Sequence, residues 1–120
     1  MKRIVSIALI LIIAATFSSC GGKPEKTSDA MYQIGLNALS TADDYIAGTI
    51  TGEEAKEQIE ELSSQADAQY TKSRSDYEND WPIMFEISIL SYEILDVSRE
   101  TNSMSEVTEA RDSLAKTLGK

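Results

Sequence analysis

Apolar residues recur every three or four positions through most of this chain, in four stretches separated by short turn or capping signals. This period places the apolar side chains on one face of an α-helix, and that face must pack against another element to leave water. A sequence of 120 residues is long enough for one domain and too short for a second sizeable core. We therefore predict an all-α fold, a small antiparallel bundle of about four helices over residues 29–120.

The first two stretches predict a helical hairpin. Gly48 can leave a helix with a positive φ, and Thr51 with Glu54 forms a capping box that starts the next helix. Ile50 and Ala55 stand where a hydrophobic staple would join the entering chain to the first turn. Because the stop and the start are so close, the two helices must be antiparallel. The two apolar stripes are Met31, Ile34, Ala38, Ala42, Tyr45 and Ile46, then Ala55, Ile59, Leu62, Ala66 and Tyr70.

The third and fourth helices follow the same logic. Pro82 is tolerated in a first helical turn, so we place the third helix start there, with Asp80 or Trp81 at its cap. Alternation over residues 83–95 would also fit a strand, but the absence of a turn signal favours a helix. A second capping box, Ser103 to Glu106, starts the fourth helix. The stripes are Ile83, Ile87, Leu90, Ile94 and Val97, then Met104, Val107, Arg111, Leu114 and Leu118, with Gly119 as the stop.

The third helix carries a second row of apolar residues beside its main stripe, made by Trp81, Phe85, Ile89 and Tyr92. One interpretation is a surface for a partner protein, because aromatic side chains dominate interface energies. The other is the second buried face of a central helix. We favour burial, because the flanking helices need a surface to pack on. The four residues are the candidate partner-binding residues.

No residue set in the chain predicts catalysis, a metal site or a cofactor, so we expect a protein that is not an enzyme. The sequence has no His, which removes the commonest general base and metal ligand. Asp76, Glu78 and Asp80 have the spacing of calcium-loop ligands, but Trp81 and Ile87 stand where that loop needs Gly and Glu. The adjacent acid pairs Asp43-Asp44, Glu53-Glu54 and Glu60-Glu61 cannot share a proton, because sequence neighbours on a helix diverge.

The N-terminus has the features of a secretory signal. Lys2 and Arg3 precede an apolar run of 14 residues, from Ile4 to Phe17, whereas a membrane-spanning helix needs about 20. We therefore expect the chain that follows to be exported.

The run ends in Phe17-Ser18-Ser19-Cys20-Gly21-Gly22, which resembles the lipobox of bacterial lipoproteins, with Phe17 where that family prefers Leu. The resemblance implies cleavage before Cys20, a diacylglyceride on its sulfur and often an acylated amine. It also implies a place in the cell membrane or outer membrane, on the extracytoplasmic side. The predicted units are a signal peptide (1–19), an acylated tether (20–28) and the helical bundle (29–120).

Segment 42–55 resembles a pattern seen in small exported helical proteins of Gram-positive bacteria; its motif is structural and implies no activity. Cleavage would remove two positive charges from a chain of net charge −9, leaving −11. Such an acidic chain is a poor partner for nucleic acid and suits a protein with a basic face. We expect a membrane-anchored, non-catalytic protein-binding or accessory domain. The alternatives are a self-associating structural lipoprotein and a lipoprotein that handles a small ligand or a metal.

Overall fold

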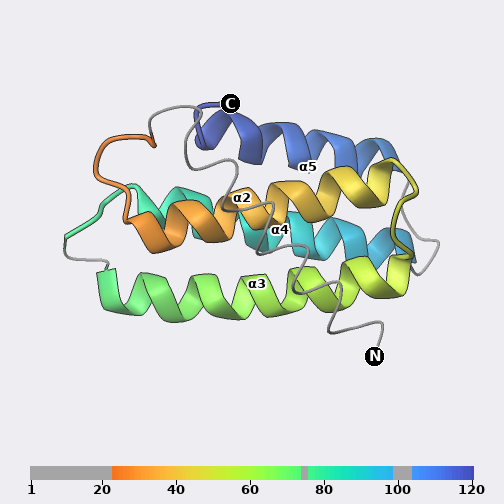
Figure 1. Cartoon of the computed structure of the whole chain (residues 1–120), viewed down its shortest axis with the longest axis horizontal. Coiled ribbons are helices and arrows are strands. Elements are labelled where there is room, and N and C mark those ends of the chain that lie inside the picture. Colours follow the sequence, from red (N-terminus) through yellow and green to blue (C-terminus); the bar gives the residue numbers. More distant parts are fainter. Residues whose placement is uncertain (1–22, 74–75, 99–103) are drawn as a thin grey trace.

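The computed structural model describes residues 23–73, 76–98 and 104–120, most of which lie in four helices (Figure 1). The helices are α2 (Asp29–Ile46), α3 (Gly52–Ser73), α4 (Asp80–Ser98) and α5 (Met104–Thr117). Within these ranges there is no strand, so the predicted all-α fold is confirmed and the strand alternative for residues 83–95 is wrong. The predicted signal peptide, Cys20 and Ser103 lie outside the described residues.

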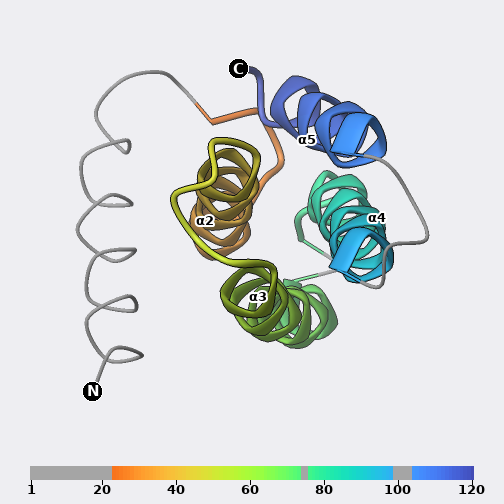
Figure 2. The same cartoon turned by 90° about the vertical axis from the view of Figure 1, so that its right-hand side faces the viewer.

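Successive helices run in opposite directions and surround a common axis, as the end view shows (Figure 2). Each helix packs against its neighbour in the chain, and a contact between α2 and α5 closes the ring. Across the bundle α2 also contacts α4, whereas α3 and α5 do not meet in the described part of the chain. Thus α2 and α4 each touch three helices, and they occupy the short diagonal of the bundle.

The predicted apolar stripes form the core. Their fully buried members are Met31, Ala38, Ala42, Ala55, Ile59, Ala66, Ile83, Ile87, Leu90, Ile94, Val107, Leu114 and Leu118. Leu62 is also buried, and Tyr70 and Val97 pack partly against the core. Two residues outside the predicted stripe of α2, Tyr32 and Leu36, are buried as well, because α2 meets helices on three sides rather than on one.

The helix ends follow the predicted signals at most positions. After α2 the Gly48 amide donates to the Tyr45 carbonyl and the Thr49 amide to Asp44, a Schellman motif that needs the positive φ of Gly48. The Glu54 amide donates to the Thr51 hydroxyl at 3.2 Å, which caps α3. The start of α4 differs: the helix begins at Asp80, two residues before the predicted Pro82. Asp80 is drawn into the helix by contacts described below.

The short diagonal depends on a close approach at Gly35 of α2. A Cβ atom placed there would lie 2.7 Å from Leu118 Cδ2 and 3.1 Å from Ile83 Cγ2. Because both neighbours are buried, neither side chain has space to move away. The missing side chain therefore lets α4 and the end of α5 pack directly on the backbone of α2.

An ion pair joins α2 to α5 at the opposite end of α2. Arg111 donates from Nε to Asp43 Oδ1 at 2.7 Å and from Nη2 to Asp43 Oδ2 at 3.3 Å. The hydrogen bond to Asp43 is the main reason that the pKa of Arg111 is raised. The next residue, Asp44, is in a less favourable place. Burial and, second, the charge of Asp43 raise the pKa of the Asp44 carboxyl above its ordinary value.

Asp43 and Asp44 should therefore have opposite effects on stability. A raised pKa means that the folded state holds the proton more tightly than the unfolded state. The Asp44 contribution is complete below the unfolded pKa, about 4, and is lost as the pH rises through the folded value. Asp44 also lies in the last turn of α2, where a negative charge opposes the helix dipole. We expect Asp44→Asn to raise the free energy of unfolding by about 0.5 kcal/mol at pH 7 and by nothing at pH 3.

The matched variant is Asp43→Asn, which breaks the pair with Arg111 and should lower the free energy of unfolding by about 0.5–1 kcal/mol at pH 7. Denaturant unfolding of both variants at the two pH values is the measurement. A loss of stability in Asp44→Asn at pH 7 would contradict this account of α2.

Candidate functional site

The outward side of α4 carries three large aromatic side chains that no other helix covers. Trp81 is 47%, Phe85 46% and Tyr92 62% exposed. The rings of Trp81 and Phe85 stack with centroids 5.1 Å apart and an interplanar angle of 13°. We call Trp81, Phe85 and Tyr92 the aromatic face. The favoured prediction, a second buried face, is therefore wrong for these three residues: the helices that α4 contacts cover only its other sides.

Ile89, the fourth candidate residue, is partly buried and packs against the core. It also lies in a shallow hollow of about 260 Å³ between α4 and α5, which we call the α4–α5 groove. The groove is lined by Glu86, Ile89 and Glu93 of α4 and by Glu106, Glu109, Ala110 and Ser113 of α5. Ile89 thus joins the aromatic face to a groove in which four of the seven lining residues are glutamates.

The glutamates set the charge along one border of the aromatic face. Glu86 and Glu93 stand seven residues apart, so they lie about two turns apart on the same side of α4. Glu109 lines the groove from α5, and Glu93 and Glu106 each take part in a further polar or electrostatic interaction of the chain. The site as a whole combines aromatic surface with an adjoining acidic groove.

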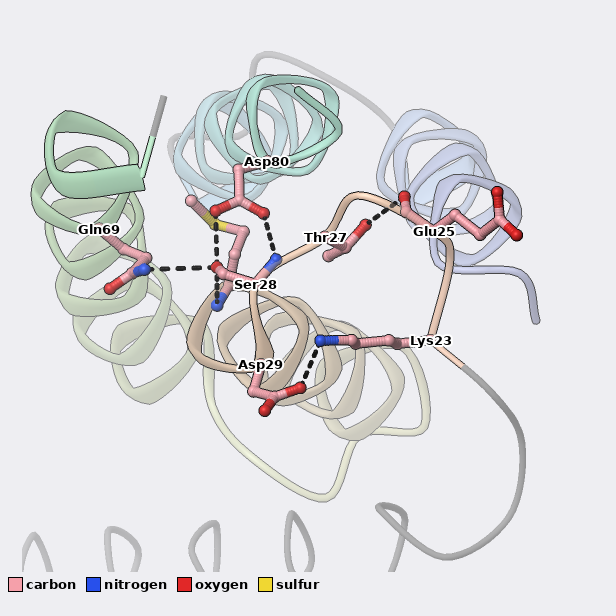
Figure 3. Close-up of polar contacts among 8 residues, drawn as sticks. Lys23, Glu25, Thr27, Ser28, Asp29, Gln69 and Asp80 are labelled. Atoms are coloured by element: carbon pink, nitrogen blue, oxygen red, sulfur yellow. Dashed lines mark hydrogen bonds and ion pairs between the residues drawn. The ribbon is translucent and has the colours of Figure 1, made fainter. Parts of the chain in front are cut away.

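A buried polar junction fixes the start of α4, where the aromatic face begins (Figure 3). Asp80 is fully buried, and its carboxylate accepts from the Ser28 amide at 2.8 Å and from the Ser28 hydroxyl at 2.6 Å. The same Ser28 oxygen caps α2 by accepting from the Met31 amide at 3.2 Å, and it accepts from Gln69 of α3 at 3.3 Å. One serine therefore ties together α2, α3 and α4.

The segment before Ser28 extends this junction. The Asn79 amide donates to the Lys26 carbonyl at 3.0 Å, and the Asn79 side chain donates to the Glu25 carbonyl. Lys26 also forms an ion pair of 3.3 Å with Glu78. Residues 23–28, which we predicted as part of a tether, are thus held against the bundle. Their lysines pair with acidic residues of the chain itself, since Lys23 contacts Asp29.

This junction sets the position of the aromatic face relative to the N-terminal segment. Trp81 directly follows Asp80, so the stacked pair begins at the end of the bundle where the chain enters (Figure 1). The sequence does carry a sign of the Ser28 cap, since Ser28 and Asp29 precede the first apolar stripe. No local signal marks the burial of Asp80, because its partners lie 52 positions away.

Other kinds of site were sought over the described residues. Among them no group of three or more Cys, Asp or Glu side chains could hold a metal ion. Within the same ranges no helix is both long and apolar enough to cross a membrane. Comparisons with protein-family models, with curated proteins and with solved structures found no match. The geometry of the aromatic face and its groove therefore has to carry the functional argument.

The buried junction makes a direct prediction. Asp80→Ala removes the acceptor of two buried hydrogen bonds, and we expect it to lower the free energy of unfolding by about 2–3 kcal/mol, since bonds to a charged group are the strong ones. Asp67→Ala is the matched control, because Asp67 is exposed on α3, and its effect should stay below about 0.5 kcal/mol. Urea unfolding followed by circular dichroism gives both values. Equal stability of the two variants would show that the junction is not a structural tie.

Proposed function

We propose that this chain is a lipid-anchored extracytoplasmic protein whose helical bundle binds another protein through the aromatic face and performs no catalysis itself. The observation that carries the proposal is the exposure of Trp81, Phe85 and Tyr92 on one side of a helix whose other sides fill the core. Clustered exposed aromatic side chains mark interaction surfaces, and tryptophan and tyrosine are enriched among residues that dominate binding energy.

The energy available on this surface is substantial. A large aromatic side chain removes about 150–250 Å² from water when it is fully buried. About half of that area remains exposed at Trp81 and Phe85. At about 25 cal/mol per Å², covering the rest supplies roughly 2–3 kcal/mol for each ring before the costs of association. The bundle leaves this free energy unused, and a partner protein would gain it.

The anchor would place this surface close to the membrane. From Cys20 to Lys23 there are three residues, which span at most about 11 Å when extended. From Lys23 onward the chain is bonded to the bundle, and the junction at Ser28 and Asp80 leads directly to Trp81. A lipid on Cys20 would thus hold the aromatic face near the bilayer and raise its effective concentration toward partners in the same membrane.

Two other functions remain as alternatives. Self-association would cover the aromatic face with a second copy, but it would also bring the glutamates of two grooves together, and like charges oppose this contact. A role in handling a metal or a small ligand has less support, since the described residues hold no group fit for a metal ion. The proposal of a protein partner agrees best with the charge and the aromatic surface together.

A photo-crosslinking side chain in place of Phe85 tests the binding function in intact cells. We expect one reproducible adduct with a second protein, because Phe85 lies in the centre of the aromatic face. The same side chain in place of Ser64, an exposed residue of α3, is the control and should give no such adduct. An adduct of only two copies of this chain would support self-association instead. The absence of any adduct at Phe85 above the Ser64 control would refute the binding proposal.

The lipid anchor is tested separately with Cys20→Ala. Two acyl chains bind a membrane stably, at about 0.8 kcal/mol per buried CH₂, so the variant should leave the envelope fraction. Mass spectrometry of the N-terminal peptide of the parent should show a diacylglyceride on Cys20, and Cys20→Ser serves as a near-isosteric control that should behave as the Ala variant does. Equal sedimentation of parent and variants with the envelope, together with an unmodified cysteine, would exclude the anchor.

A further inference from the structure

We infer that the partner presents an amphipathic helix whose apolar stripe covers the aromatic face and whose Lys or Arg side chains lie over the α4–α5 groove. The inference rests on the proposed function and specifies the chemistry of the partner. It depends on one arrangement: an uncovered aromatic row with an acidic groove directly along one side of it.

The shape of the surface suits a helix. From Trp81 to Tyr92 the row covers eleven residue steps of α4, or roughly 16 Å at 1.5 Å per residue. About three turns of a partner helix have the same length, and their side chains at i, i+3 or i+4 and i+7 can pack between those of the row. Ile89 carries the contact from the row into the groove, since it lines both.

The charge of the groove selects the partner. Glu86 and Glu93 on α4 face Glu106 and Glu109 on α5 across the groove. A neutral apolar helix seated on the aromatic face would take part of these carboxylates out of water without any compensating charge, which is unfavourable. A Lys or Arg side chain can keep its charged end at the carboxylates while its aliphatic part covers Ile89. The complementary partner therefore has cations along one edge of its apolar stripe.

The same charges exclude two other occupants of this surface. A second copy of the chain would bring acidic groove residues and a net charge of −9 against the same charges. An anionic membrane surface would be repelled for the same reason. The aromatic face is therefore selective for a protein segment that is both apolar and basic.

Trp81 is the only tryptophan of the chain and lies in the proposed contact, so its fluorescence reports binding directly. The full chain, purified from membranes and held in phosphatidylcholine nanodiscs, is titrated with a tryptophan-free amphipathic helix of 18 residues, to use about five turns, built from Leu and Lys. A peptide with Glu in place of Lys and a scrambled Leu/Lys peptide are the controls. We expect a blue-shifted Trp81 emission with the amphipathic Leu/Lys peptide alone, and weaker binding at high salt.

Matched variants locate the charge effect. Glu86→Gln combined with Glu109→Gln removes two groove charges, and we expect the Leu/Lys peptide to bind about tenfold more weakly, since two rim pairs contribute up to about 1 kcal/mol each. Glu60→Gln combined with Glu61→Gln removes two exposed charges from α3 and should change the affinity less than about twofold. Phe85→Ser should also weaken binding about tenfold or more.

Two results would overturn the inference: equal losses in the groove and α3 double variants, or equal binding of the Leu/Glu peptide. The sequence of the peptide crosslinked at position 85 in cells separates this failure from that of the proposed function. A neutral or acidic crosslinked segment would contradict the basic helix and leave protein binding intact. Absence of any adduct would remove both proposals.

Discussion

The buried contact between Asp80 and Ser28 is the interaction on which the rest of the arrangement depends. A carboxylate removed from water is strongly unfavourable unless hydrogen bonds replace its hydration, and here the amide and the hydroxyl of one serine do so. The serine oxygen is in turn bonded to Met31 and Gln69, so the contact sets the start of α2, the late turns of α3 and the start of α4 together. Moving any one of these helices would leave a buried charge without its partners.

This constraint explains why α4 exposes aromatic residues. With its first turn held by Ser28 and its inner stripe buried against α2, α3 and α5, α4 has no freedom to rotate its outer side inward. A helix that is apolar on several sides is normally buried on all of them. Four helices in a ring leave the outer side of each open, and only another molecule can cover it. The exposed face is thus a consequence of the helix count as much as of the residues on α4.

The sequence predicts what depends on local chemistry and fails where distant elements decide. The apolar period, Gly48 and the Thr51 cap act within a few residues, and they correctly predict the hairpin and the core stripes. The burial of Asp80 depends on Ser28, 52 positions earlier, and no local pattern encodes it. The exposure of the aromatic face fails for a related reason. Periodicity tells which residues share a side of a helix, but the number and place of the neighbouring helices decide which side is covered.

Aromatic residues close to a membrane anchor raise a physical problem, because tryptophan and tyrosine favour the membrane interface and could insert into the bilayer that holds them. The groove glutamates offer a solution. They lie directly beside the aromatic face, and an anionic headgroup region repels them. Lys23 and Lys26, which could offset this repulsion, are already paired with Asp29 and Glu78. The acidic border would therefore keep the aromatic face away from the lipid and available to a protein that carries the opposite charge.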